Sequence, residues 1–190
     1  MDFATVRLFF ALLAIAANVA TIAIIAVGIA GRSGPRGRDL REQVFGAIAG
    51  HELWLAFSVA TVATLGSLYL SEIVHLVPCT FCWYQRIAMY PLVVILGIAA
   101  WRKDGGARIY AAAIATIGAA IASYHRLIQA VPELGGSACS TGVPCTAAYF
   151  TLFGFVSIPY MALSAFLLIL ALLCVDRTNS PSKPSSLQNA

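Results

Sequence analysis

Five long apolar stretches, separated by short polar segments, set the pattern of this chain. They cover roughly residues 8–30, 53–73, 83–101, 109–128 and 150–175. A helix needs about 20 apolar residues to cross the ~30 Å hydrocarbon core of a bilayer, and each stretch is close to or above that length. Because water does not reach the backbone inside a bilayer, these stretches predict five transmembrane helices. Pro91 and Pro159 fall within the third and fifth stretches, where neighbouring helices make a proline tolerable.

The composition also indicates a membrane protein. Of 190 residues, 60% are hydrophobic and only 11% are charged, whereas soluble domains carry about 25% charged residues. The net charge of +4 does not indicate nucleic-acid binding, because the basic residues lie in short segments between the apolar stretches. We therefore expect an all-α, polytopic membrane protein, with a four-helix transmembrane bundle and one extra N-terminal transmembrane helix.

The basic residues of the connecting segments predict the orientation of the chain. Nine lie in segments 31–52 and 102–108 and in the C-terminal tail, whereas the alternate set has only Arg7, Arg86 and Arg126. Basic residues collect on the cytoplasmic side of a membrane, so the nine mark the cytoplasm. The N-terminus and two close cysteine pairs are then expected on the extracytoplasmic side.

The chain divides into four parts by this pattern. Residues 1–30 are expected to remain as a transmembrane helix, although Arg7 followed by an apolar stretch also resembles a signal peptide. Residues 31–52 predict a basic cytoplasmic loop with a short interfacial helix over 39–49. Residues 53–175 hold the predicted four-helix bundle. The Ser- and Pro-rich residues 176–190 predict a disordered cytoplasmic tail.

The first cysteine pair, Cys79 and Cys82, opens the third apolar stretch in Val-Pro-Cys-Thr-Phe-Cys-Trp-Tyr-Gln-Arg. A Cys-x-x-Cys at a helix start is typical of redox-active dithiols, because the helix N-terminus stabilises a thiolate. A static disulfide would gain little by closing so short a loop. A zinc site would need two more ligands, and the sequence has no second Cys-x-x-Cys or His pair.

Arg86 lies on the same predicted helix face as both cysteines, at positions i, i+3 and i+7. It could extend to the outer membrane interface. The alignment favours a second interpretation, in which its charge stabilises a thiolate or the oxygen of a reduced quinone.

The second pair, Cys139 and Cys145, precedes the fifth apolar stretch. Gly142 and Pro144 favour the chain reversal that would bring the two cysteines within disulfide distance. A structural clip of this loop is one interpretation. Beside an outward Cys-x-x-Cys we favour a thiol–disulfide relay, since exchange passes through mixed disulfides between neighbouring sulfurs.

Two further residues invite chemical interpretation. Cys174 lies at the cytoplasmic end of the last stretch, away from both pairs, and is expected to be an inert reduced thiol. His125 closes the fourth stretch on the outer side. A single histidine near an interface is more often structural, and a role as ligand or proton donor is the alternative.

At these residues the sequence resembles the DsbB/BdbC disulfide-formation proteins of bacterial membranes. The resemblance rests on Pro-Cys-x-x-Cys-x-Tyr-x-Arg at 78–86, a second outward cysteine pair, and the four-helix order over 53–175. The Cys-x5-Cys spacing that ends in Gly-Val-Pro-Cys, and the run Phe-Gly-Phe-Val-Ser-Ile-Pro at 153–159, look more like the BdbC branch. The extra N-terminal helix departs from the family's four-helix pattern.

The resemblance implies a thiol:quinone oxidoreductase of the bacterial cytoplasmic membrane that supports disulfide formation in exported proteins. Cys79 and Cys82 would pass electrons to a membrane quinone, either ubiquinone or menaquinone, with Cys82 beside the ring. Arg86 matches the family's quinone-contacting arginine, and His125 falls near a histidine of the quinone site.

The resemblance also implies a protein partner. Cys139 would form the mixed disulfide with an extracytoplasmic, thioredoxin-fold thiol oxidase of the DsbA/BdbD type, and Cys145 would be its mate. No bound metal is implied.

Three other functions stay open at the level of the sequence. A vitamin K epoxide reductase-like oxidoreductase also combines a helical bundle, two cysteine pairs and a quinone, but there the loop pair precedes the Cys-x-x-Cys. A non-enzymatic membrane scaffold would use disulfides only to clip its outer loops. A thiol reductant importer would run electrons in the opposite direction.

Overall fold

The computed structural model describes residues 3–135 and 143–175. Over these residues it contains six α-helices and no named β-strand. Five helical segments are long and apolar enough to cross a membrane: Phe3–Ala30, Glu52–Ile73, Thr80–Arg102, Gly105–Ala130 and Ile158–Val175. The prediction of an all-α, polytopic membrane protein is confirmed.

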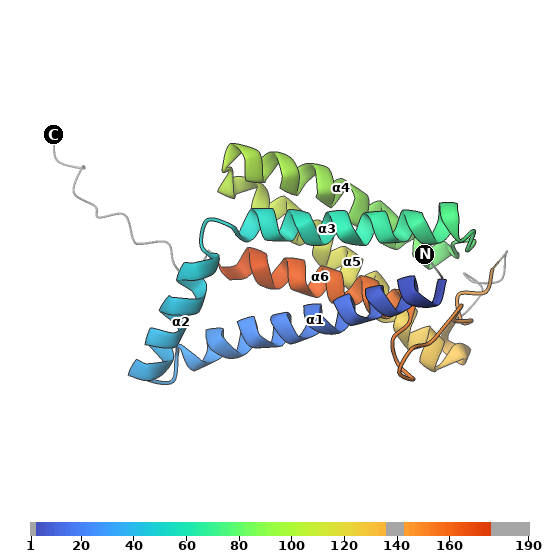
Figure 1. The fold of residues 1–190 in the computed structure, drawn as a ribbon, viewed down its shortest axis with the longest axis horizontal. Coiled ribbons are helices and arrows are strands. Elements are labelled where there is room, and N and C mark those ends of the chain that lie inside the picture. Colours follow the sequence, from blue (N-terminus) through green and yellow to red (C-terminus); the bar gives the residue numbers. More distant parts are fainter. Residues whose placement is uncertain (1–2, 136–142, 176–190) are drawn as a thin grey trace.

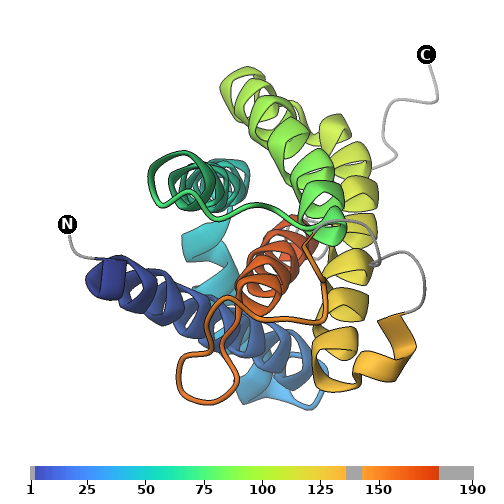
Figure 2. The same cartoon turned by 90° about the vertical axis from the view of Figure 1, so that its right-hand side faces the viewer.

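The helices form a bundle around a central C-terminal helix (Figures 1 and 2). In chain order they are α1 (Phe3–Ala30), α2 (Pro35–Ile48), α3 (Glu52–Leu68), α4 (Thr80–Arg102), α5 (Arg108–Ala130) and α6 (Ile158–Val175). Helix α6 packs against α1, α3 and α5, and α4 packs against α3 and α5. A π-helical turn, η1 (Tyr69–Ile73), extends α3, and short 3-10 turns, η2 (Gly105–Ala107) and η3 (Pro132–Gly135), flank α5.

The connections gather at two opposite ends of the bundle. Figure 1 shows the start of α1, the α3–α4 connection and the segment before α6 at one end. Helix α2 and the turn between α4 and α5 lie at the other end. The cysteines of the described loops and the arginine-rich segments therefore lie at opposite ends, as alternating membrane crossings require.

The sequence prediction was wrong about the start of the fifth membrane helix. Residues 150–157 form a loop closed by an isolated antiparallel bridge between Leu152 and Val156. The chain reverses at Phe153 and Gly154, whose φ values of 53° and 78° no helix allows. Pro159 consequently lies in the first turn of α6, where its missing N–H costs nothing, and not in the helix interior.

The short helix predicted over 39–49 is present but longer than expected. It begins at Pro35, a favourable residue for a first helical position, and not near residue 39. Figure 1 shows α2 crossing the bundle end between α1 and α3. Phe45 is its one buried residue and lies near Gly28 of α1, so it anchors α2 to the transmembrane part.

Close approaches and polar contacts hold the helices together. A side chain at Gly118 of α5 would lie only 2.3 Å from the Phe166 ring, so glycine lets α5 and α6 meet there. Asn18 of α1 donates to the Tyr160 hydroxyl at 3.0 Å and to the Ser164 hydroxyl at 2.8 Å, both on α6. Small residues and interhelical hydrogen bonds are what hold membrane helices together in the absence of a hydrophobic driving force.

Candidate active site

The first cysteine pair lies where α4 begins, as the sequence predicts. Cys79 is the N-cap of α4 in an extended conformation, and its Sγ accepts a hydrogen bond from the backbone N–H of Cys82 at 3.4 Å. Pro78 precedes the cap, so its missing N–H removes no helical hydrogen bond. The two Sγ atoms lie 2.8 Å apart, and both residues are free thiols.

His125 of α5 connects this pair to the second cysteine loop. Its Nε2 lies 3.7 Å from Cys79 Sγ and 3.2 Å from the carbonyl oxygen of Cys145. Because a carbonyl oxygen only accepts, Nε2 carries the proton, and Nδ1 is left to accept from the Gln85 amide at 3.1 Å. The imidazole is buried and fixed through both nitrogens.

The surroundings of Cys79 favour its protonated form. The hydrogen bond with Cys82, followed by burial, raises the pKa of Cys79 to about 12, and the contact with His125 opposes this rise. Cys79 therefore keeps its proton at neutral pH and can donate it toward the neighbouring sulfur. Cys82, in the first turn of α4, is then the sulfur placed to carry negative charge, because helix N-termini favour anions.

Cys145 lies against the first pair. It is buried in an apolar cluster with Cys79 and Ile128. The Tyr149 hydroxyl donates to the carbonyl oxygen of Val77 at 2.6 Å, which ties the loop after Cys145 to the segment before Cys79. Cys139 lies outside the described residues, so its pairing with Cys145 stays a prediction.

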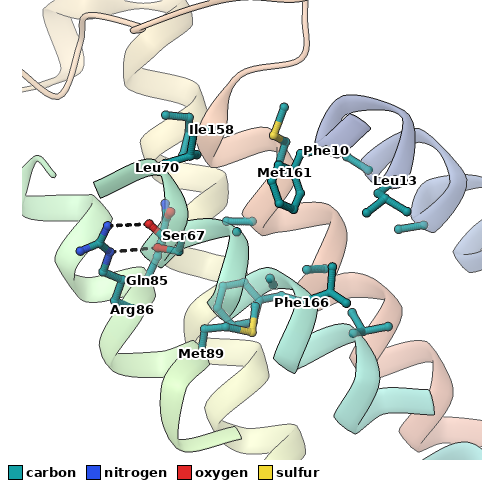
Figure 3. A pocket seen from close by; sticks show the side chains of 18 of the residues that line it. Phe10, Leu13, Ser67, Leu70, Gln85, Arg86, Met89, Ile158, Met161 and Phe166 are labelled. Carbon is teal, nitrogen blue, oxygen red and sulfur yellow. Dashed lines mark hydrogen bonds between the residues drawn. The ribbon is translucent and has the colours of Figure 1, made fainter. Parts of the chain in front are cut away.

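A large apolar cavity adjoins Cys82 within the bundle (Figure 3). Its volume of about 490 Å³ lies within the roughly 300–1,000 Å³ of small-molecule sites. Helices α1, α3, α4 and α6 contribute its walls. Polar side chains gather on the α3–α4 side, where Ser67, Gln85 and Arg86 lie.

Arg86 is held on this side of the cavity by α3. Its Nε donates to the Ser67 hydroxyl at 3.0 Å, and its Nη2 donates to the Ser67 carbonyl oxygen at 3.1 Å (Figure 3). The guanidinium also lies over the Trp83 ring, 5.2 Å from the centroid. These contacts hold a positive charge inside the bundle, so Arg86 does not simply extend to the membrane interface.

Cys82 lines two different pockets of the protein. It lines the large cavity together with Arg86, and it lines a smaller pocket together with Cys79, His125 and Pro144. The family resemblance implied that Arg86 and His125 both lie at a quinone site. In the structure Arg86 lines the cavity, whereas His125 lines the smaller pocket. One sulfur faces both surroundings.

The same site brings together three donor atoms that could hold a soft metal ion. The Cys79 and Cys82 sulfurs and a His125 ring nitrogen lie within 4.8 Å of one another. Thiolate and imidazole are zinc ligands, but a structural zinc site needs four. The sequence argument against zinc missed the third donor, because His125 is 43 residues beyond Cys82.

Sequence reasoning also missed Ser67, Gln85 and Tyr149. Ser67 is one of several hydroxyl residues along α3, and nothing in the sequence distinguishes it from Ser58 or Thr61. Gln85 sits directly before Arg86 in the cysteine motif, a position that would have justified considering it.

Together, fold and site define a multi-pass helical membrane protein with a dithiol at the start of a membrane helix. A sequence model of the family described as disulfide bond formation protein DsbB matches residues 51–175. The chain belongs to the DsbB family, whose proteins act in membrane disulfide bond formation.

Similar proteins carry the same description. The chain is 49% identical over 124 residues to disulfide bond formation protein C of Bacillus subtilis, covering 65% of this chain and 90% of the relative. It is 48% identical over 127 residues to probable disulfide formation protein C 2 of Bacillus anthracis, covering 67% and 91%. Probable disulfide formation protein of Oceanobacillus iheyensis is 48% identical over 123 residues, covering 63% and 84%. No solved structure matches the chain.

Proposed function

We propose that this protein is a thiol:quinone oxidoreductase that reoxidises an extracytoplasmic, thioredoxin-fold dithiol oxidase. The partner dithiol loses two electrons and two protons and becomes a disulfide, and a membrane quinone takes up both to become a quinol. Residues 53–175 form the redox bundle. The cysteine end faces outward, because α2 and the α4–α5 turn carry the basic residues at the opposite end.

The position of Cys82 carries this proposal. A dithiol that transfers electrons from a protein to a lipid-soluble acceptor must contact both. Cys82 lines a pocket shared with the second cysteine loop and a cavity embedded among membrane helices. A structural disulfide clip would need neither the cavity nor a partly buried cation beside it.

Thiol–disulfide exchange connects the two cysteine pairs. A partner thiolate attacks the Cys139–Cys145 disulfide at Cys139, and the second partner thiol then releases the partner as a disulfide. The reduced second pair next attacks the Cys79–Cys82 disulfide, which leaves the first pair as a dithiol. Each step exchanges one disulfide for another, so two electrons move inward each time.

The residues around the first pair orient the last transfer. Cys79 keeps its proton and donates a hydrogen bond to Cys82, which leaves Cys82 as the electron donor. His125 fixes Cys79 beside Cys145, where exchange must occur. Arg86 places a positive charge on the cavity side, where it stabilises negative charge.

The cavity fits a quinone. A quinone head group offers carbonyl oxygens that accept hydrogen bonds, and Arg86 and Gln85 offer N–H donors at the polar side of the lining. Its isoprenoid tail is apolar, as is most of the remaining lining. When bound, the quinone supplies the two-electron acceptor for the dithiol.

The experiment combines purified protein in lipid nanodiscs, a reduced thioredoxin-fold oxidase and ubiquinone or menaquinone. The wild type is expected to reduce quinone and oxidise the partner in equal amounts. Cys82→Ser should abolish quinone reduction, whereas Cys174→Ser, which removes an exposed thiol from the far end of α6, should leave it unchanged. Undiminished quinone reduction by Cys82→Ser would overturn the mechanism, and net reduction of the partner by quinol would reverse its direction.

A further inference from the structure

Helix α1 forms one wall of the cavity, although it precedes the region that matches the DsbB family. The α1 residues that line the cavity are three and four positions apart, so they lie on one face of the helix. The lining residues on α1 are Phe10, Leu13, Ala14, Ala16, Ala17 and Ala20. Figure 3 shows Phe10 and Leu13 on the opposite side of the cavity from Arg86.

The α1 wall differs chemically from the wall around Arg86. Every residue that it contributes is apolar, and four of the six are alanines. The polar residue of this part of α1, Asn18, is engaged with Tyr160 and Ser164 of α6. The short alanine side chains leave room within the bundle, while the Asn18 contacts hold α1 in place against α6.

Helix α1 borders the cavity on a side where it has little contact with α3. It packs along α6 but makes few contacts with α3, and Figure 2 shows α1 and α3 diverging on one side of α6. Phe10 bridges them at the cysteine end, where a side chain at Gly66 would lie 2.7 Å from its ring. Beyond this contact the cavity is lined by alanines of α1 and by Val59, Val62 and Ala63 of α3.

We propose that α1 binds the isoprenoid tail of the quinone and determines which tails the site accepts. This inference rests on the proposed function. The polar side of the cavity, with Cys82 and Arg86, takes the head group, and the tail then runs along the alanine face of α1. A tail gains little hydrophobic free energy by leaving lipid for an apolar wall, so selection depends on shape and packing.

Substituting a bulky residue on the α1 wall tests the inference. Ala17→Phe fills space on the lining face, whereas Ala23→Phe places the same ring on an exposed position outside the lining. Each variant is assayed in nanodiscs with a quinone carrying one isoprene unit and with one carrying a long isoprenoid tail. Ala20→Leu provides a smaller change on the same face if Ala17→Phe fails to assemble.

The expected result is selective. Ala17→Phe should raise the KM for the long-tailed quinone about tenfold, because the ring fills space that the tail would occupy, and should leave the short-tailed quinone reaction unchanged. Retained short-tail activity also shows that the variant is folded. Ala23→Phe should resemble the wild type with both quinones, and Ala20→Leu should show the same selectivity as Ala17→Phe to a smaller degree.

Two results would overturn the inference. Equal losses with both quinones would show that α1 bounds the head group, and unchanged kinetics would show that the tail lies elsewhere. Native mass spectrometry tests whether a phospholipid occupies the cavity instead of the quinone tail. If a co-purifying phospholipid is lost in Ala17→Phe while the quinone kinetics stay unchanged, the α1 wall binds that lipid. If the wild type reduces neither quinone, the proposed function itself fails.

Discussion

Removing the Ser67 hydroxyl tests how Arg86 contributes to the site. Ser67 holds Arg86 through two hydrogen bonds, one to its hydroxyl and one to its backbone carbonyl, and only the first depends on the side chain. Ser67→Ala therefore loosens the guanidinium without removing its charge. The Trp83 ring and the remaining hydrogen bond keep Arg86 near its place.

The magnitude follows from hydrogen bonds between membrane helices, which contribute about 0.6 kcal/mol on average and up to about 1.7 kcal/mol. If the lost hydrogen-bond energy weakens the interaction of Arg86 with the bound quinone by the same amount, kcat/KM for quinone decreases by between about 3-fold and about 20-fold. Because the donor is the charged Arg86 guanidinium, we expect a decrease toward the upper end of this range. In the proposed mechanism the partner is oxidised before quinone is reduced, so oxidation of the partner in a single turnover should not change.

The assay follows quinone absorbance in nanodiscs at fixed partner concentration, with kcat and KM separated. The matched control is Thr61→Ala, which removes another hydroxyl of α3 that bonds only to the Phe57 carbonyl of its own helix. Equal kcat/KM in the Ser67→Ala and Thr61→Ala variants would refute the role assigned to the Ser67–Arg86 contact.

Three other predictions concern the bundle end and the cysteine site. Glu52→Gln removes the carboxylate paired with buried Arg108, so the thermal midpoint in detergent should fall, because breaking a buried pair costs about 3–5 kcal/mol; an unshifted midpoint contradicts this. In the reduced protein the pKa of Cys79 is raised to about 12, mainly by Cys82, so Cys82→Ala should lower it and speed alkylation of Cys79 at pH 8–9; unchanged alkylation would argue against that hydrogen bond. His125→Ala should slow thiol exchange between the two cysteine pairs in stopped-flow measurements, while the KM for quinone stays constant. A rise in the KM for quinone without slower exchange would instead indicate that His125 contacts the quinone.

Much of the fold was predictable because membrane crossings depend on local composition. Four of the five predicted crossings agree with the structure to within a few residues, since about 20 apolar residues in sequence make a spanning helix. Residues 150–157 are the exception. They are as apolar as a helix, but the left-handed conformations of Phe153 and Gly154 turn the chain back, and Val156 is buried inside the loop.

The candidate site was predictable only where the chain itself brings residues together. The spacing of Cys79, Cys82 and Arg86 predicts their common helix face, and the structure brings Cys82 and Arg86 to one cavity. The contacts of His125 with Cys79, and of Arg86 with Ser67, join residues on different helices. No periodicity reports such contacts, because they depend on how the helices pack and not on the pattern within each.

The Cys-x-x-Cys spacing matters because the two cysteines lie on either side of the start of α4. Cys79 is the N-cap, outside the helix and beside the loop of Cys145, whereas Cys82 lies three residues inside and reaches the cavity. A helix starting three residues earlier would direct both sulfurs into the membrane, and one starting three residues later would leave both in the loop. Pro78 disfavours a helical conformation for the residue before it, Val77, and so opposes the earlier start. The boundary of α4 thus places one sulfur toward the second cysteine loop and the other toward the apolar cavity.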